Sequence, residues 1–313
     1  MIGEIIAILA VLTFVVSNVI FRKTEHETSP TFINFFRTAT GTLTFIIISL
    51  FMGVFQNIFI LPWDIWIFLF LSFLFGQVIG DTSYFNAQKE LGTTIALAVS
   101  MTFPVFTFIL SLIFLNRPFE IKMLISLFLI SSGIIIIGKN KMTHNISKNS
   151  INSEKKKTNV LKSLSYGLVA SLGWAVGLVI IDYSVNRIDD ILNTNGVSTI
   201  IGNVIRFPFA LSILGSMVIR ENITSSKINK IKLKKSSRTY LLLTLGAFIG
   251  TSLGAFLYTE AARVAGANVM SLIATAAPLF ALPLTYWINK ETISKIGFIG
   301  VVLTILGVVI ILT

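Results

Sequence analysis

The stretch GQVIGDTSYFNAQKELGTTIALAVSMTFP, residues 76–104, occurs twice in this chain of 313 residues. Its second copy is GTSLGAFLYTEAARVAGANVMSLIATAAP, residues 250–278, and it lies 174 positions further on without a gap. The copies share glycines, a tyrosine, an alanine and a proline in six matched pairs: Gly76 and Gly250, Gly80 and Gly254, Tyr84 and Tyr258, Ala87 and Ala261, Gly92 and Gly266, and Pro104 and Pro278. Such coincidences at one fixed offset indicate an internal repeat.

The composition around this repeat excludes an ordinary soluble domain. Hydrophobic residues make up 54% of the chain and charged residues only 12%, and the mean hydropathy is +0.85. In soluble domains about a quarter of the residues are charged. The apolar runs are about 20 residues long, which is enough for a helix to cross a hydrocarbon core about 30 Å thick. We therefore expect an all-α integral membrane protein.

Charged and turn residues divide the chain into ten expected spans. These are 3–21, 31–51, 65–88, 93–115, 121–138, 161–181, 197–219, 239–259, 268–288 and 296–312. A polar, basic segment separates the first five from the last five. The predicted organisation is thus a five-helix repeat over 1–138, a linker over 139–160 and a second five-helix repeat over 161–313.

The two halves are predicted to be inverted repeats. Asn34 and Arg37 in the second span correspond to Asn203 and Arg206 in the seventh, at an offset of 169. Because each half has an odd number of helices, the second half enters the bilayer from the opposite side. Inverted repeats of this kind place a binding site at their interface, near the membrane midplane.

Loop charge predicts the orientation of the chain in the membrane. The net charge is +11, which in a soluble protein would point to nucleic acid. Here, however, 19 Lys and Arg residues lie in loops on one side of the predicted spans and four on the other. This bias predicts a multi-pass protein of the cell membrane, with the 139–160 linker in the cytoplasm and both termini outside. We expect no nucleic-acid partner.

Charges inside the spans are candidates for function because they are costly in a membrane. Arg37 and Asp81 are each about 10 Å from the same face of the membrane, at 1.5 Å per helical residue. They are expected either to form an ion pair or to face the transport pathway. Arg206 has no equivalent acid, since Ala255 occupies the position of Asp81. Its expected partners are Glu260, Asp182, a carbonyl group or a substrate anion.

Polar and aromatic side chains beside the repeated glycines are candidates for a cavity lining. Helical spacing places Gln77, Asp81 and Tyr84 on one face of the third span. The full candidate set is Phe14, Asn18, Gln77, Asp81, Tyr84, Trp174, Thr251 and Tyr258. Ordinary packing between helices is the alternative role for each of them.

The shared glycines and prolines have a structural interpretation. Gly76, Gly80, Gly250 and Gly254 are spaced four apart, which allows close approach of helix backbones. Pro104 and Pro278 lie inside expected helices, where the ring removes a backbone hydrogen bond and produces a kink.

Catalytic chemistry has little support in the sequence. There are no cysteines, and the two histidines, His26 and His144, are isolated in loops. We therefore expect no metal site, no cofactor and no catalytic residue, and we do not expect an enzyme.

Taken together, these features resemble the EamA family of the drug/metabolite transporter superfamily. The resemblance is carried by two five-helix halves, an Arg in the second helix of each, and a Tyr, Ala, Gly and Pro in fixed order, and it covers nearly the whole chain outside the linker. It implies a secondary transporter, often an exporter of amino acids or other metabolites, with a cavity between helices one, three, four, six, eight and nine. It also implies cytoplasmic termini, whereas the loop charges place them outside. Phe14 stands where the family often has Trp.

The sequence therefore predicts export of a small polar or amphipathic metabolite by alternating access. Expected partners are a small-molecule substrate, the lipid bilayer and, as a coupling species, a proton or another ion. One alternative is a polyspecific exporter of cationic drugs, for which Asp81 is the remaining candidate acid. A second alternative is a membrane scaffold that handles lipid. No feature fixes the oligomeric state.

Overall fold

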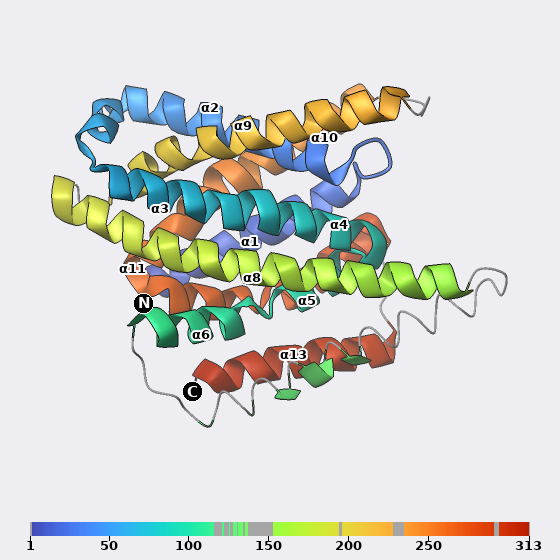
Figure 1. Cartoon of the computed structure of the whole chain (residues 1–313). Coiled ribbons are helices and arrows are strands. Elements are labelled where there is room, and N and C mark those ends of the chain that lie inside the picture. Colours follow the sequence, from blue (N-terminus) through green and yellow to red (C-terminus); the bar gives the residue numbers. More distant parts are fainter. Residues whose placement is uncertain are drawn as a thin grey trace.

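The fold is a bundle of long helices, shown as a computed structural model in Figure 1. The structure describes residues 2–115, isolated positions between 121 and 136, and residues 153–193, 196–227, 235–290 and 294–312. All of the regular elements in these ranges are helical.

The described helices follow one another with short connections. In the first half they are α1 (Ile2–Arg22), α2 (Pro30–Phe51), η1 (Phe55–Ile60), α3 (Trp63–Phe73), η2 (Leu74–Asp81), α4 (Thr82–Leu91), α5 (Thr93–Ser100) and α6 (Phe103–Leu115). In the second half they are α8 (Ser153–Leu192), α9 (Ser198–Lys227), α10 (Ser237–Ala247), η3 (Phe248–Leu253), α11 (Gly254–Ala274), α12 (Ala277–Leu284), η4 (Thr285–Asn289) and α13 (Lys295–Leu312).

The expected ten spans are matched in part. Within the described ranges seven helices are long and apolar enough to cross a membrane, and Lys295–Gly307 is a shorter apolar helix. Half of the fifth expected span, 121–138, lies outside the described residues. The eighth expected span continues into the start of the ninth as the helical stretch Ser237–Ala274, in which Gly266 has non-helical φ and ψ. The rest of the ninth span follows a two-residue turn at Thr275 and Ala276.

The helix α8 begins inside the segment that the sequence analysis assigned to the linker. Residues 139–152 lie outside the described ranges, but 153–160, which the sequence analysis assigned to the linker, already belong to α8. The physical reason is that Glu154 and the lysines at 155–157 are good helix formers, so polarity here marks a helix leaving the membrane rather than irregular chain.

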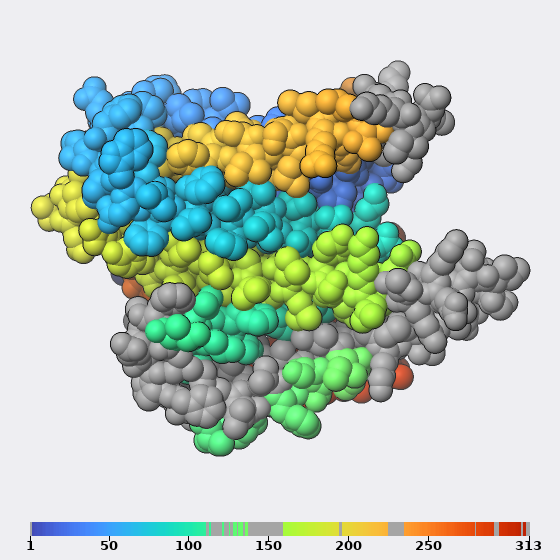
Figure 2. All heavy atoms as spheres, in the orientation of Figure 1, coloured from blue at the N-terminus to red at the C-terminus, as the bar shows by residue number. Residues whose placement is uncertain are grey.

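The two halves interleave rather than sit side by side. The first helix of each half packs mainly against the other half: α1 against α10, η3, α11 and α12, and α8 against α3, η2, α4, α5 and α6. The Arg-bearing helices α2 and α9 also pack against each other. In Figure 2, α9, α3 and α8 form successive bands across one face of the molecule.

The internal repeat recurs in the backbone conformation. The third and eighth spans each contain a π-helical segment, Leu74–Asp81 and Phe248–Leu253, which begin 174 residues apart. Each span then ends at a glycine with positive φ, Gly92 (φ 83°, ψ 163°) and Gly266 (φ 84°, ψ 159°). Only glycine adopts this conformation readily. The sequence analysis found the glycines but not the π-helices.

The repeated prolines mark helix starts, which corrects their expected mid-helix position. Pro104 is the second residue of α6 and Pro278 the second residue of α12. Before each of these helices two residues form a turn, and the hydroxyl of a threonine in that turn donates a hydrogen bond to a carbonyl of the preceding helix. Thr102 Oγ1 donates to the Val99 carbonyl (2.9 Å), and Thr275 Oγ1 donates to the Leu272 carbonyl (2.6 Å). Proline is tolerated in a first helical turn because its missing N–H has no partner there.

The repeated glycines lie where a neighbouring helix comes close. Gly76 and Gly80 face Gly173, Trp174 and Gly177 of α8. Gly250 and Gly254 face Ser17 and Thr13 of α1. The same seam therefore occurs twice, each time between the π-helical segment of one half and the first helix of the other.

The outer surface is rich in large apolar side chains. Phe51, Trp63, Ile67, Leu241 and Phe248 are among the exposed residues, each with more than half of its surface accessible. A surface of this kind suits contact with lipid.

The α8 seam predicts different responses to two alanine substitutions. A Cβ built on Gly173 would lie 2.6 Å from the Phe75 carbonyl oxygen, whereas on Gly76 its nearest neighbour would be 3.8 Å away. We expect Gly173→Ala to reduce the free energy of unfolding by about 1–3 kcal/mol, because a backbone atom must move. Gly76→Ala, the matched control, should cause little change. Thermal unfolding in detergent measures both, and equal stabilities would contradict the described packing.

The loop between α1 and α2 predicts a pH-dependent contribution to stability. The Glu27 carboxylate accepts hydrogen bonds from the Ser236 N–H (2.7 Å) and the Thr239 hydroxyl (2.6 Å), at the start of α10. These bonds and the nearby His26 lower the pKa of Glu27 from about 4.5 to about 2. The stabilisation is therefore complete above the ordinary pKa and disappears as the pH falls towards 2.

We expect Glu27→Gln to be less stable than the wild type at pH 6 and the two to converge as the pH approaches 2. Thermal unfolding across that range measures the difference. A difference that persists unchanged at pH 2 would show that the carboxylate charge is not its cause.

Candidate functional site

A cavity lies at the seam between the two interleaved halves. It contains about 810 Å³ of space between atoms, open solvent included. Its lining comes from both halves and includes Phe14, Arg37, Asp81, Trp174, Arg206 and Tyr258. Two arginines and one aspartate thus border a space that is otherwise mostly apolar.

A polar chain crosses the middle of the bundle beside this cavity. Asp81, at the end of η2, accepts a hydrogen bond from the Trp174 indole N–H (2.8 Å) and lies 3.3 Å from the Arg37 guanidinium. Arg37 Nε in turn donates to Thr251 Oγ1 in η3 (2.9 Å). All four side chains are buried. The structure thus brings Arg37 and Asp81 together as an ion pair, and the chain joins both halves.

Arg206 lies in the equivalent place in the second half but has different partners. Its Nε donates to Asn203 Oδ1 (2.7 Å), one Nη donates to Thr259 Oγ1 (2.7 Å), and its guanidinium lies 4.6 Å from the centre of the Phe73 ring. Its other terminal nitrogen, Nη1, is buried and has no hydrogen-bond partner within the part of the chain that the structure describes. Among the described residues, no carboxylate is within ion-pair distance of Arg206.

The two acids that the sequence offered to Arg206 are engaged elsewhere, which corrects that expectation. Glu260 pairs with Arg263 (2.6 Å) and accepts from the Thr199 hydroxyl (2.7 Å). Asp182 accepts from the Ala267 N–H (2.8 Å), the first amide after the break at Gly266. Both carboxylates are bound by groups near helix ends, an arginine and a free backbone amide. The spacing of residues along the chain does not predict such partners.

Aromatic side chains form the wall of the cavity around Trp174. The ring centres of Phe14, Tyr84 and Phe103 lie 5.6, 5.4 and 6.2 Å from that of Trp174. Phe14 and Phe103 meet the indole edge to face, a favoured arrangement for aromatic pairs. Two methionines, Met101 and Met270, complete the apolar lining.

Five of the eight predicted lining residues border the cavity, and three do not. Phe14, Gln77, Asp81, Trp174 and Tyr258 are in the lining, whereas Asn18, Tyr84 and Thr251 are not. Tyr84 is fully buried and donates to Gln88 Oε1 (2.5 Å). Its expected face was derived from 3.6 residues per turn, but the π-helical segment that precedes it has a wider turn.

Asn18 and Thr251 are likewise held by protein groups. The Asn18 amide donates to the Phe14 carbonyl (2.9 Å), one helical turn away. Thr251 accepts from Arg37 and is fully buried. Both therefore stabilise the wall of the site rather than face its interior.

The sequence analysis missed several lining residues, among them Ser72, Phe73, Met101, Phe103 and Met270. Met101 and Phe103 flank the break between α5 and α6, so the proline that follows was a usable signal for their position. Phe73 and Met270 are apolar residues in apolar helices, and nothing in their local sequence separates them from lipid-facing neighbours.

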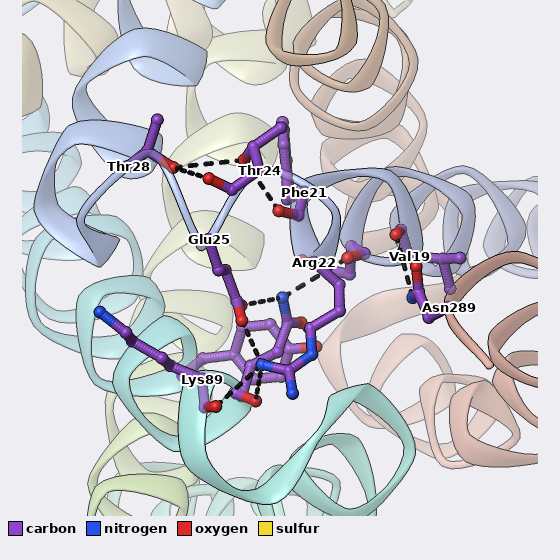
Figure 3. Close-up of polar contacts among 11 residues, drawn as sticks. Val19, Phe21, Arg22, Thr24, Glu25, Thr28, Lys89 and Asn289 are labelled. Carbon is purple, nitrogen blue, oxygen red and sulfur yellow. Dashed lines mark hydrogen bonds and ion pairs between the residues drawn. The ribbon is translucent and has the colours of Figure 1, made fainter. Parts of the chain in front are cut away.

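Beyond the aromatic wall, a buried polar network lies at the end of α1 (Figure 3). Arg22 forms an ion pair with Glu25 and donates to the carbonyls of Gln88 and Lys89, both at 2.9 Å. The Gln88 amide donates to Glu25 Oε1 (2.7 Å). Asn289 donates to the Val19 carbonyl at the same end (3.1 Å). The network therefore ties α1 to the last turn of α4 and to η4.

A second network lies at the opposite end of the bundle. Arg263 bridges Asp189 (2.8 Å) and Glu260 (2.6 Å), and Asp189 also accepts from the Gly196 N–H (3.2 Å). An exposed pair between Arg187 and Asp64 (3.1 Å) joins α8 to α3 there. The central cavity thus has ionic contacts at both ends.

The central ion pair predicts a coupled effect of two substitutions. Asp81→Asn leaves the Arg37 guanidinium buried without its counter-charge, which should cost about 3–5 kcal/mol in the free energy of unfolding. Adding Arg37→Gln removes the isolated charge, so the double variant should be more stable than Asp81→Asn alone. Thermal unfolding of the two single variants and the double variant gives the coupling energy. Additive effects would show that the pair does not interact.

Comparisons with known proteins agree with this architecture. The chain matches the family model described as the EamA-like transporter family at residues 1–139 and 161–313. It is 24% identical over 315 residues to a protein of Archaeoglobus fulgidus named "Uncharacterized transporter", covering 100% of this chain and 98% of the relative. A solved crystal structure with 13% identity has a similar fold, with a TM-score of 0.64 over 99% of this chain and 96% of the other. With its seven long apolar helices, the chain is a multi-pass membrane protein and belongs to the EamA-like transporter family.

Proposed function

We propose that this protein is a secondary transporter that exports a small amphipathic metabolite, such as an amino acid or a similar compound, by alternating access. The observation that carries the proposal is the cavity between the interleaved halves, lined by side chains from both. A site at the interface of inverted repeats becomes accessible from each side in turn when one group of helices rocks against the other.

The helix breaks support a mechanism of this kind. The cavity lining includes Met101, Phe103 and Ala277, which adjoin the breaks before Pro104 and Pro278. The breaks divide the fourth and ninth spans into shorter helices that can change direction relative to each other. Movement at these points would alter the cavity itself.

The position of the cavity indicates which end is closed. On α1 the lining stops at Phe14, and on α8 it begins at Trp174 and continues to Ile181. The lining thus extends towards the end that carries Arg263. The aromatic wall and the Arg22–Glu25 network separate the cavity from the other end of the bundle, which carries the loops rich in Lys and Arg. We call this the basic-loop end, and the proposal assigns it to the cytoplasm.

Export of cationic drugs receives less support. Asp81 is the candidate acid for exchanging a proton with a cation, but its carboxylate is already engaged by Arg37 and Trp174. A lipid-handling role would favour a site open to the bilayer, whereas this cavity lies between helices of both halves.

Transport is tested directly in proteoliposomes. Purified protein is reconstituted with labelled amino acids, organic acids and amines, and flux is followed in both directions. We expect saturable flux of at least one of these classes that empty liposomes lack. No flux of any class in either direction would refute the proposal.

Alternating access is tested by cysteine labelling, since the chain has no cysteine of its own. Ala255→Cys places a thiol in the cavity lining, and Ala210→Cys is a buried control outside it. We expect a membrane-impermeant maleimide to label Ala255→Cys faster from the Arg263 end than from the basic-loop end. Adding Glu25→Gln should raise labelling from the basic-loop end. Equal labelling from both ends before that change would contradict a closed network.

A further inference from the structure

The two central arginines differ in one respect that bears on the substrate. Arg37 is neutralised by Asp81 at 3.3 Å, whereas the partners of Arg206 among the described residues are all neutral: the Asn203 amide, the Thr259 hydroxyl and the Phe73 ring. An arginine side chain stays protonated in proteins. The described cavity lining therefore carries two positive charges and one negative charge, and the unbalanced charge belongs to Arg206.

An unbalanced buried charge is costly, so its retention calls for a compensating group. Arg206 is 2% exposed, and among the described residues its Nη1 group has no hydrogen-bond partner. Arg37 Nη1 also has none, but Arg37 has the counter-charge of Asp81. The neighbouring Asn203, whose Oδ1 accepts from Arg206, also has an unpartnered buried group, Nδ2. Both unsatisfied groups are donors, so the missing partner is an acceptor.

The internal repeat indicates where that acceptor belongs. The residue equivalent to Asp81, 174 positions later, is Ala255, and Ala255 lines the cavity. In the first half a carboxylate at this position meets the arginine. In the second half the carboxylate is absent from the protein, and the space beside the methyl group belongs to the cavity.

We propose that the carboxylate of the substrate takes the place of the missing aspartate and binds Arg206. The inference rests on the proposed transport function and narrows its substrate class to small monoanions with an apolar body, which leaves out zwitterionic amino acids. The anionic group pairs with the Arg206 guanidinium, while the apolar body lies against the wall formed by Phe14, Trp174, Met101 and Met270. Asp81 stays paired with Arg37 and does not contribute a site for a cation.

Three probes with one apolar body and different charges test the proposal. They are 3-phenylpropanoate, the neutral 3-phenylpropanamide and the cationic 3-phenylpropylamine, and binding to the purified full chain is followed by tryptophan fluorescence and thermal shift. Because the acid forms a charge-assisted hydrogen bond with the guanidinium and the amide does not, we expect the acid to bind at least about tenfold tighter than the amide. The amine should not bind measurably better than the amide.

Variants assign this preference to Arg206. Arg206→Gln should abolish the difference between acid and amide, and Arg206→Lys should retain part of it because the charge remains. Arg220→Gln, on the same helix but exposed, is the matched control and should behave as the wild type. Equal binding of acid and amide to the wild type, or an unchanged preference in Arg206→Gln, would overturn the proposal.

A second variant keeps the test valid if Arg206→Gln does not fold. Ala255→Asp restores the carboxylate of the first repeat, so we expect it to raise the unfolding temperature and to eliminate binding of 3-phenylpropanoate. Ala255→Asn, of similar size but neutral, should reduce binding much less. Undiminished acid binding by Ala255→Asp would contradict the assigned position.

Flux measurements on the same preparations separate this inference from the transport proposal. Flux that is indifferent to substrate charge and to Arg206 would refute the anion site and leave transport intact. Binding of the acid that depends on Arg206, without flux of any labelled compound, would refute transport and leave the anion site intact.

Discussion

A charged side chain in the middle of a membrane must be matched by another group, and here the match is made across the two halves of the chain. Asp81 is held between Arg37 of its own half and Trp174 of the other, and Arg37 reaches Thr251 in the other half. Because α2, η2, α8 and η3 each supply one member, none of these segments can move independently without breaking a buried polar contact. The helices α1 and α8 also join the two halves, because each of them packs against the glycine-lined seam of the opposite half.

Much of this arrangement could be predicted from the repeat. The glycines occur in both copies of the repeat because helix backbones touch at some of them and because Gly92 and Gly266 have a positive φ. Their common offset therefore predicted the internal symmetry of the fold. The pairing of Arg37 with Asp81 followed from their similar depth. Other features had no such signal. A π-helical turn leaves no fixed sequence pattern, and it shifted Tyr84 away from the face that regular helical spacing assigns to it. The partners of Glu260 and Asp182 depend on which helix ends meet, which spacing along one chain does not reveal.

The differences between the two halves are as informative as their likeness. Where the first half has Asp81, Gln77 and Thr82, the second has Ala255, Thr251 and Phe256. In the first half Asn34 donates to the Gln77 carbonyl and to Thr82, so its amide is satisfied, whereas the equivalent Asn203 keeps one unpartnered group. This asparagine is therefore satisfied within the protein in the first half only, although Arg37 and Arg206 both keep an unpartnered Nη1 among the described residues. A symmetric scaffold with an asymmetric interior can hold an asymmetric molecule.

The two π-helical segments that recur in the repeat give the bundle a property that a regular helix lacks. A π turn closes its hydrogen bonds over five residues instead of four, so each contains more chain per turn than an α-helix. If one residue of that surplus were drawn into a regular turn, every side chain beyond it would rotate by about 100° around the helix axis, since an α-helix has 3.6 residues per turn. Asp81 stands at the end of the first such segment, directly beside Trp174 and Arg37. The contact that joins the two halves thus lies at the end of the segment, where such a change would rotate the side chains.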